Sequence, residues 1–228
     1  MDVSGTRILV TGGTGELGRR IAARLRDAGA RTVVAGRPGE RLTDAMSHSE
    51  AYGVDLSAAG AGNALIEAVR ATGAIDGLVL AHGIVAFGNV ADTPLDAVNA
   101  LTAVNQTSVA DIVMSAIPSL RESKATGNEP FIATISGVIS ESAVAGMASY
   151  GASKAGLRHF VAAAQRELRR DGIRIFDTRP PHTETGLASR AIVGHAPNFP
   201  AGADPDAVAA RIVEAILTGE TDVPSTSF

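Results

Sequence analysis

The sequence has no cysteine, and aromatic residues account for only 4% of its 228 residues. The absence of cysteine excludes disulfides, thiolate metal sites and a cysteine nucleophile. Because 45% of the chain is nevertheless hydrophobic, its core must be built mainly from Ala, Val, Ile and Leu. Helices packed on a parallel sheet permit such a core, and the length suits one sizeable domain.

A net positive charge and long apolar runs are also missing. The net charge is −4, and no run of Lys or Arg stands out, which argues against a nucleic-acid partner. No stretch reaches about 18 uninterrupted apolar residues, because Asp76 and His82 interrupt the best candidate. The first ten residues lack the basic region and long apolar core of a signal peptide. We therefore expect a soluble, cytoplasmic protein with no membrane partner.

The histidines outside the motifs described below show no metal-binding pattern. His48, His159 and His195 have no ligand spacing with one another or with a carboxylate cluster. Zinc sites in proteins instead use several ligands at characteristic short spacings. We expect no metal site.

Short apolar segments alternate with helix-like segments from end to end. The expected strands are 6–10, 31–35, 51–54, 77–80, 131–135 and 173–177. The expected helices are 15–28, 40–48, 61–71, 94–122, 150–170 and 205–217. This alternation is typical of βαβ units with right-handed crossovers and a parallel sheet buried on both faces. We expect one α/β domain over residues 1–228, with a doubly wound, mostly parallel sheet in a three-layer arrangement.

A glycine-rich turn joins the first expected strand to the first expected helix. It reads TGGTGELG over residues 11–18 and follows an apolar run. Gly12 can make the tight turn, Gly15 lets a diphosphate approach the backbone, and Gly18 lets the helix pack close to the strand. The helix N-terminus then offers free N–H groups to an anion, although such turns also occur in proteins that bind no nucleotide. The cofactor contacts expected here are Gly12, Thr14, Gly15, Glu16, Leu17 and Gly18.

Residues that directly follow the second and third strands face the place where such a sheet binds its ligand. Arg37 follows the second strand. An arginine there neutralises the 2′-phosphate of NADP, whereas an acidic residue would favour NAD; the alternative is a solvated loop arginine. Asp55, followed by Leu56, can accept a bond from an adenine amino group or serve as a cap or turn residue. We expect NADP(H) to be preferred and NAD(H) to be the alternative.

Tyr150 and Lys154 form the pattern that carries chemistry. They lie four residues apart in the segment YGASK, so they share one face of an expected helix, a single turn apart. A phenol has an ordinary pKa of about 10, and a nearby ammonium lowers that pKa toward the range useful for proton transfer. The spacing alone is common, but its position after the fifth strand, in a chain with the glycine turn, favours a catalytic pair.

These features together resemble the short-chain dehydrogenase/reductase family over about residues 6–187. The features are TGGTGELG, YGASK, and Asn105 within the expected helix 94–122. The resemblance implies a Rossmann-like oxidoreductase that passes a hydride between a nicotinamide cofactor and a small-molecule carbonyl or secondary alcohol. It implies that Tyr150 donates the proton, that Lys154 binds the nicotinamide ribose and lowers the tyrosine pKa, and that Asn105 positions a water. A homodimer or homotetramer is implied as well.

The sequence departs from the family pattern where an oxyanion-stabilising serine is expected. Gly137 occupies that slot, and Ser136 lies one residue farther from the tyrosine. A one-residue loop insertion before Tyr150 would restore Ser136 to the role, which is the interpretation we favour. The alternatives are that Ser140 or Ser142 bends in, or that the hydroxyl is missing. Loss of one such donor costs about 10²–10³ in rate in other enzymes.

Two other segments at strand ends depart from the family pattern. The family's Asn-Asn-Ala-Gly after the fourth strand is LAHG at residues 80–83. A packed or cofactor-flanking role fits His82 better than a catalytic one, because the fold already supplies a proton donor. Two prolines, 180–181, follow the sixth strand, and residues 183–203 are expected to form the substrate loop. By resemblance, the cofactor contacts in these segments are Ala81, His82, Gly83, Pro180, Thr183 and Thr185.

Two hypotheses about function follow. The first is an NADP(H)-preferring oxidoreductase acting on a carbonyl or alcohol. The second is a catalytically weak dinucleotide-binding protein that senses cofactor or serves a partner. It is motivated by Gly137 in the serine slot and by the glycine turn, whose glycines follow the form GxxGxxG rather than GxGxxG. The combination of Tyr150, Lys154 and Asn105 favours the first, because a binding protein has no need of all three.

Overall fold

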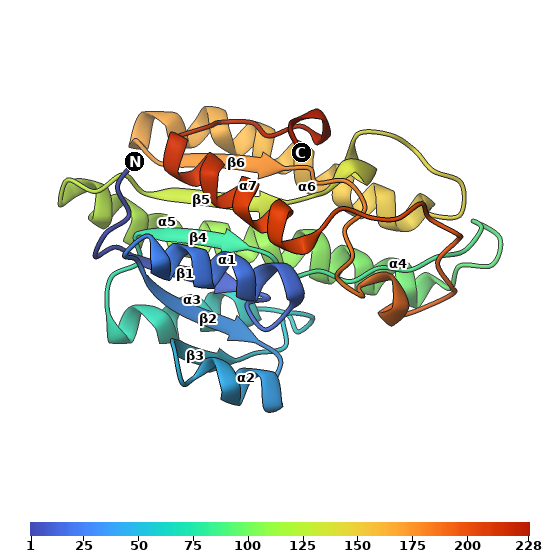
Figure 1. Ribbon diagram of the computed structural model, residues 1–228, viewed down its shortest axis with the longest axis horizontal. Helices are drawn as coiled ribbons and strands as arrows, with labels where there is room; N and C mark the ends of the chain where they lie inside the picture. Colours follow the sequence, from blue (N-terminus) through green and yellow to red (C-terminus); the bar gives the residue numbers. More distant parts are fainter.

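The computed structural model describes all 228 residues and contains one six-stranded sheet (Figure 1). The strands are β1 (Arg7–Thr11), β2 (Arg31–Gly36), β3 (Glu50–Gly53), β4 (Gly77–Leu80), β5 (Phe131–Ile135) and β6 (Arg174–Thr178). Every neighbouring pair is parallel, in the order β3-β2-β1-β4-β5-β6. The direction of winding reverses between β1 and β4, and a sheet of this class binds its ligand at the carboxyl ends of the strands at that point.

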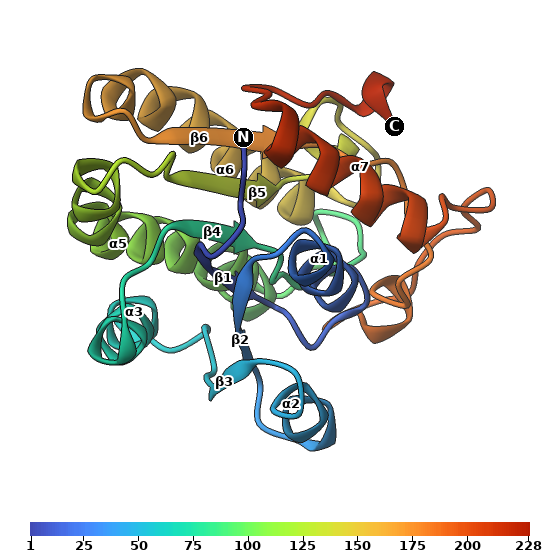
Figure 2. The same ribbon diagram turned by 60° about the vertical axis from the view of Figure 1, so that its left-hand side comes forward.

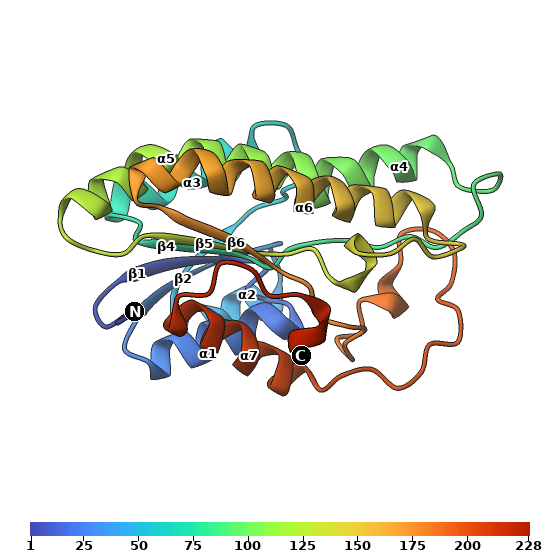
Figure 3. The same ribbon diagram turned by 90° about the horizontal axis from the view of Figure 1, so that it is seen from above.

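Seven α-helices cover the two faces of the sheet, as the edge-on view of Figure 3 shows. On one face lie α1 (Glu16–Asp27), α2 (Glu40–Ala45) and α7 (Pro205–Thr218). On the other lie α3 (Ala61–Thr72), α4 (Leu95–Thr102), α5 (Ser108–Ala125) and α6 (Ala148–Leu168). Figure 2 shows α1 and α7 side by side, joined by the ion pair of Arg20 with Asp206. The expected three-layer α/β class is confirmed.

Successive residues of each strand face opposite helical layers, so the sheet separates two cores. Leu9 packs into the core under α3, α5 and α6, whereas Ile8 and Val10 pack into the core under α1 and α7. In β5, Ile132 faces the first core and Ala133 the second. Strands buried on both faces read as continuous apolar runs rather than as alternating ones, which explains why these segments could be recognised in the sequence.

The expected helix 94–122 is interrupted at a residue predicted to be functional. Between α4 and α5, residues Ala103–Thr107 form a short π-helix. A π-helix inserts an extra residue into a helical turn, and such turns are frequent at functional sites. Asn105 lies at its centre and is fully buried. The apolar periodicity of the sequence did not reveal this interruption.

The C-terminal segment runs along β6 without forming a full strand. Val223 makes a single parallel bridge to Thr178. The Met1 amino group donates to the Leu217 carbonyl of α7, and Met1 and Phe228 both pack against the core under α1 and α7. None of the helices combines the length and apolar character needed to cross a bilayer.

Candidate functional site

The glycine turn leaves no room for side chains where it crosses the end of β4. Gly12 has φ +65°, and a Cβ atom placed on it would lie 2.6 Å from the His82 backbone nitrogen. A Cβ atom on Gly18 would overlap the Gly12 carbonyl oxygen. Gly15 is the N-cap of α1, and its N–H donates to the Gly12 carbonyl at 2.9 Å. The turn therefore needs its glycines for its own geometry, and the N-terminus of α1 opens at the carboxyl end of β1.

The acidic residue in the first turn of α1 is paired within its own helix. Glu16 accepts from Arg19 at 2.6 Å and from Arg20, and these two bonds lower its pKa to about 2. The pairing offsets the repulsion that an isolated carboxylate would exert on a phosphate. Of the other turn residues, Thr14 packs against Gly36, and Leu17 packs against the core beneath α1.

Arg37 and Asp55 are both exposed at the carboxyl edge of the sheet. Asp55 accepts from the N–H of Ser57 at 3.0 Å and from its hydroxyl at 2.8 Å. These bonds, and secondarily the charge of Arg37, hold its pKa below the ordinary value. Asp55 thus acts as a turn residue, and its contact with adenine stays a prediction. Leu56 is buried in the core, whereas the Arg37 guanidinium makes no hydrogen bond or ion pair with the protein.

His82 links three structural elements by a directed chain of hydrogen bonds. Its Nδ1 lies 2.6 Å from the Thr11 hydroxyl, and its Nε2 lies 2.9 Å from the Ser108 hydroxyl. Ser108 donates in turn to the Val104 carbonyl at 2.8 Å. Burial, reinforced by the Lys154 charge, lowers the His82 pKa to about 3, so the ring is neutral. Because the Ser108 hydroxyl donates its hydrogen to Val104, it accepts from His82, and the ring proton is therefore on Nε2. It braces the ends of β1 and β4 against the π-helix.

Asn105 connects the segment after β4 to the helix that carries Tyr150. Its Oδ1 accepts from the Ile84 N–H at 2.9 Å, and its Nδ2 donates to the Ile84 carbonyl at 3.0 Å. Nδ2 also donates to the Ser153 hydroxyl at 3.0 Å, which itself donates to the Tyr150 carbonyl at 2.8 Å. Asn105 therefore fixes α6 relative to the π-helix, and both of its amide hydrogens and one lone pair of its oxygen are engaged by protein groups.

Lys154 and Tyr150 lie on the first turns of α6. Lys154 is only 6% exposed, and its Nζ donates to the Ile135 carbonyl at 2.9 Å. Burial lowers the Lys154 pKa to about 8, opposed by the charge of Asp177. Burial raises the pKa of the Tyr150 phenol to about 12, the opposite direction from the sequence expectation. The reason is that the ammonium is held on a backbone carbonyl, while apolar side chains surround the phenol.

The apolar surroundings of Tyr150 come from four different segments. Val85, Phe87 and Met147 form a small buried cluster against which the tyrosine packs. Phe199 lies on the same cluster, with its ring 6.0 Å from Phe87. The segment expected to be the substrate loop thus contributes an aromatic side chain to the cluster on which Tyr150 packs. The other partly buried members of the cluster are Ile139, Leu187, Ala188 and Ala191.

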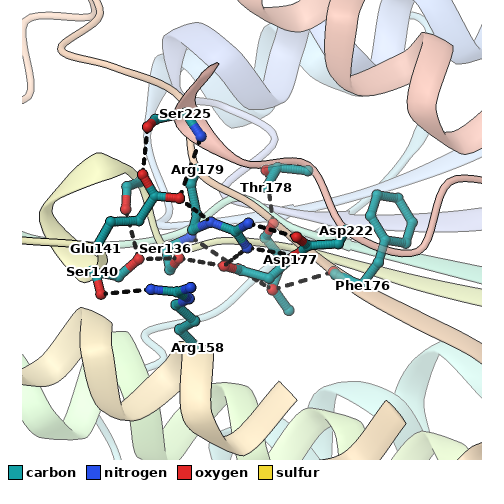
Figure 4. Close-up of polar contacts among 12 residues, drawn as sticks. Ser136, Ser140, Glu141, Arg158, Phe176, Asp177, Thr178, Arg179, Asp222 and Ser225 are labelled. Atoms are coloured by element: carbon teal, nitrogen blue, oxygen red, sulfur yellow. Dashed lines mark hydrogen bonds and ion pairs between the residues drawn. The ribbon is translucent and has the colours of Figure 1, made fainter. Parts of the chain in front are cut away.

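The hydroxyl of Ser136 is directed into a buried polar network (Figure 4). It donates to the Asp177 carboxylate and lies 2.8 Å from the Ser140 hydroxyl. Ser140 in turn donates to the Gly137 carbonyl at 2.8 Å, while Ser142 is exposed. Gly137 has φ +78°, a conformation that suits glycine. Both buried hydroxyls are therefore engaged with protein groups, and neither bonds to Tyr150.

The segment after β6 is held mainly by local bonds. Pro180 is buried, and its carbonyl accepts from the Val138 N–H at 2.9 Å. The Thr183 hydroxyl donates to the Pro181 carbonyl at 2.8 Å, and the Thr185 hydroxyl accepts from the Leu187 N–H at 3.3 Å. Contacts of these threonines with a carboxamide stay predictions. No group of three or more His, Asp or Glu side chains is arranged to hold a metal ion.

Sequence reasoning missed Asp177, the last residue of the expected strand 173–177. Its carboxylate is 3% exposed and accepts from Thr134 Oγ1 at 2.6 Å, from the Ser136 N–H at 3.2 Å and from the Ser136 hydroxyl. A signal was present in the sequence, because an acidic residue ending a buried strand needs partners. The identity of those partners depends on the neighbouring strand and could not be read from the strand itself.

Comparison with known proteins places the chain in a family. A family model described as short chain dehydrogenase matches residues 6–192. The chain is 33% identical over 195 residues to 2,5-dichloro-2,5-cyclohexadiene-1,4-diol dehydrogenase LinX of Sphingobium indicum, covering 82% of this chain and 76% of that protein.

Solved structures share the fold along almost the whole chain. A short chain dehydrogenase from Burkholderia cenocepacia in complex with NADP has a TM-score of 0.85 at 19% identity, covering 98% of this chain and 89% of that one. A short-chain dehydrogenase from Sphingobium yanoikuyae in complex with NADPH also has a TM-score of 0.85, at 22% identity over 96% and 87% of the two chains. The protein belongs to the short-chain dehydrogenase/reductase family and is an oxidoreductase of that type.

Proposed function

We propose that this member of the family is an NADP(H)-preferring oxidoreductase that interconverts a carbonyl and a secondary alcohol, with Tyr150 exchanging the proton. The observation that carries the proposal is the convergence of three predicted catalytic residues on one place. A Cβ atom on Gly83 would lie 3.2 Å from Asn105 Oδ1 and 3.3 Å from Lys154 Nζ, and Asn105 is linked through Ser153 to the Tyr150 backbone.

The glycine turn fits a dinucleotide. Gly12 and Gly18 tolerate no side chain, and Gly15 presents the N-terminus of α1 to an anion. Arg37 has no partner in the protein and lies where a 2′-phosphate would be read. Neighbours of the same fold bind NADP or NADPH, which supports the preference. When bound, the dinucleotide supplies or accepts the hydride.

The phenol of Tyr150 is suited to donating a proton in the reductive direction. With a pKa raised to about 12, it keeps its proton at neutral pH and can pass it to the oxygen of a carbonyl that becomes an alcohol. Lys154, with a pKa of about 8, is mostly an ammonium at pH 7. Its charge stabilises the phenolate left after transfer, and its remaining N–H donors can hold a ribose hydroxyl.

The cluster around Tyr150 favours an apolar substrate. Tyr150 packs against the cluster of Val85, Phe87 and Met147, and Phe199 packs against the same cluster. None of these four neighbouring side chains in the cluster carries a hydrogen-bonding group able to select a polar substrate. Apolar pockets with few polar groups orient a substrate through those few groups. We infer that the carbonyl is positioned by Tyr150 and that the remainder of the molecule is apolar.

Replacing Tyr150 with Phe tests the proposal directly. NADPH oxidation should be followed at pH 7 with a panel of apolar ketones and aldehydes, and the variant should lose about 10²–10⁴-fold in kcat, the usual contribution of a general acid. Binding of NADPH, measured by its fluorescence, should change little. Phe160→Tyr, which adds a hydroxyl elsewhere on α6, is the control. Equal turnover by wild type and Tyr150→Phe would contradict the proposal.

One observation favours a second candidate, a dinucleotide-binding protein with little catalysis. The Ser136 and Ser140 hydroxyls are taken up by protein groups, and Gly137 fills the slot of the oxyanion donor. We keep Ser136 as the proposed donor, since rotation of its side chain would free the hydroxyl. Tight NADPH binding without turnover across the whole carbonyl panel would favour the second candidate.

We also propose a homodimer or homotetramer. Leu95 on α4 is 71% exposed and Met114 on α5 is 59% exposed, so two large apolar side chains face outward on the helices that flank Asn105 and could form a subunit contact. Light scattering after gel filtration should give at least twice the 23.2 kDa of the chain. A monomer at micromolar concentration would contradict this part of the proposal.

A further inference from the structure

Asp177 is a buried carboxylate that the proposed mechanism does not use. It follows Ile175 and Phe176, two fully buried apolar residues, along β6 and is itself 3% exposed. Burying a carboxylate is costly unless hydrogen bonds and opposite charges compensate for lost hydration. Asp177 therefore needs hydrogen-bond and charge partners within the protein, and these partners connect it to the proposed active site.

Four groups surround the Asp177 carboxylate, and the three that donate hydrogen bonds to it come from Thr134 and Ser136, at the end of β5 and just beyond it. Oδ1 accepts from Thr134 Oγ1 at 2.6 Å and from the Ser136 N–H at 3.2 Å, and Oδ2 accepts from the Ser136 hydroxyl. The fourth group, Arg179 Nη1, lies 3.6 Å from Oδ2. The Asp177 carboxylate thus binds the residues on both sides of Ile135, which are Thr134 and Ser136.

The peptide between Ile135 and Ser136 joins Asp177 to Lys154. Its N–H is shared between the Thr178 carbonyl at 3.1 Å and the Asp177 carboxylate at 3.2 Å, and its carbonyl oxygen accepts from Lys154 Nζ at 2.9 Å. The two charged groups make no direct ion pair; they bind opposite ends of one amide. Hydrogen bonds in such a chain strengthen one another, because a carboxylate on the N–H increases the negative charge on the carbonyl oxygen.

Few other charges face this chain. On the lysine side, His82 at the end of β4 is neutral because burial lowers its pKa to about 3, and Tyr150 on α6 keeps its proton because burial raises its pKa to about 12. On the carboxylate side, Arg179 is shared with Glu141 at 2.5 Å and with Asp222 at 2.7 and 2.8 Å. Asp177 is therefore the one carboxylate whose charge acts on buried Lys154.

We propose that Asp177 is a positioning residue for Lys154: its carboxylate fixes the Ile135–Ser136 peptide, whose carbonyl oxygen holds the lysine ammonium at the mouth of the sheet. The consequence for catalysis rests on the proposed function, in which Lys154 works as a cation. Loss of the Asp177 charge leaves the ammonium buried with a weaker acceptor, and Lys154 then releases its proton at a lower pH.

Because the chain has few lysines, the titration of the Lys154 side chain can be measured. Lys124 and Lys154 are the only lysines in the sequence, and Lys124 is exposed. In protein labelled with ¹³Cε-lysine, NMR titration follows both side chains separately, with Lys124 as an internal reference. In the wild type, Lys154 should titrate near pH 8. In Asp177→Asn its midpoint should fall by about one pH unit, the effect of removing a nearby opposite charge, while Lys124 stays in place.

Asp222→Asn is the matched control, because it removes a carboxylate of the same network that reaches Lys154 only through Arg179. Its Lys154 midpoint should equal that of the wild type. If Asp177→Asn does not fold, Asp177→Thr replaces it, since a β-branched residue suits a strand and its hydroxyl oxygen can accept from Ser136. A Lys154 midpoint that does not move in the folded Asp177 variant, or that moves equally in Asp222→Asn, overturns the proposal.

The titration and the enzyme assay separate the two proposals. If the Lys154 midpoint falls in the Asp177 variant but no carbonyl compound is reduced by the wild type, the link between Asp177 and Lys154 stands and the proposed function fails. If the wild type reduces carbonyls, the alkaline limb of its kcat profile should move to lower pH in Asp177→Asn along with the NMR midpoint. Active enzyme with an unmoved midpoint overturns the positioning role alone.

Discussion

Two buried cations at opposite ends of the parallel sheet are bound differently by the protein. Arg7 at the amino end and Lys154 at the carboxyl end are both 6% exposed. The Arg7 guanidinium makes five hydrogen bonds, three to backbone carbonyls between residues 69 and 74, one to Glu50 at 2.7 Å and one to Thr72 at 2.7 Å. The Lys154 ammonium makes one, to a single carbonyl.

This difference separates a buried cation held for stability, Arg7, from a buried cation available for chemistry, Lys154. At the amino end, Asp76 accepts from the Arg7 N–H, from Ser123 and from Asn128, so every charge there has several partners. At the carboxyl end, burial lowers the Lys154 pKa to about 8 because its partners are few. Perturbed pKa values cluster at functional sites for this reason.

The largest effect on stability is expected at the amino end. Arg7→Met removes a buried cation with five bonds and leaves Glu50 and three carbonyls short of a donor. Because Glu50 is partly exposed, we expect a loss of about 2–4 kcal/mol in the free energy of unfolding, measured with urea. Arg31→Met, an exposed arginine that bonds only to the Gly5 carbonyl, should change it by about 0.5 kcal/mol or less. Equal losses in the free energy of unfolding would show that the buried bonds of Arg7 stabilise the fold no more than the exposed bonds of Arg31.

At the carboxyl end the same kind of substitution should act in the opposite direction. Lys154→Met removes a buried ammonium whose single bond does not compensate for its lost hydration, so the free energy of unfolding at pH 7 should rise by about 1–3 kcal/mol. Turnover should be lost in the same variant. A destabilised Lys154→Met protein would show that the bond to Ile135 outweighs the cost of burial. Arg7 and Lys154 would then both stabilise the fold.

An exposed arginine at each end of β2 extends the comparison to ligand binding. Arg37→Ala should weaken NADPH by about 10–100-fold, as expected for a charge-assisted contact with phosphate, and should affect NADH much less. Arg31→Ala, at the other end of the strand, is the matched control and should leave both affinities unchanged. Equal losses for NADPH and NADH in Arg37→Ala would show that this arginine does not read the 2′-phosphate.

The smallest expected effect is a dependence of stability on pH. The folded pKa of Lys154, about 8, lies below its ordinary 10.5, so between these values the unfolded chain binds more protons and stability rises with pH. The stability difference between Lys154→Met and the wild type should therefore be greatest below pH 8 and shrink as pH approaches 10.5. A difference that stays constant from pH 7 to 10 would contradict the lowered pKa.

Much of the carboxyl end could be predicted from the sequence because its signals are local. The glycine turn needs its residues for geometry within a few positions, and Gly12 and Gly18 do leave no room for side chains. Tyr150 and Lys154 share a helical turn by spacing alone. Ser136 shows the limit of this reasoning. Its distance from Tyr150 along the chain could not say where its hydroxyl points, and the structure directs it to Asp177 on the next strand.

The pKa values show the same limit. Spacing on a helix predicted an ammonium that lowers the Tyr150 pKa, but the direction is decided by what packs around both groups. Apolar side chains from distant segments raise it, and Lys154 is bound by a carbonyl of β5. Desolvation depends on every neighbour in space, and the sequence does not state which neighbours those are.

What the sequence determined by itself is the order of strands and helices, the glycine turn and the helical pairing of Tyr150 with Lys154, because each depends on residues close together in the chain. Tertiary structure alone decided the π-helix at Asn105, the direction of the Ser136 hydroxyl and the partnership of Asp177 with Lys154. These three depend on residues dozens of positions apart that meet only when parallel strands align their carboxyl ends, and no local pattern encodes which side chains will face each other there.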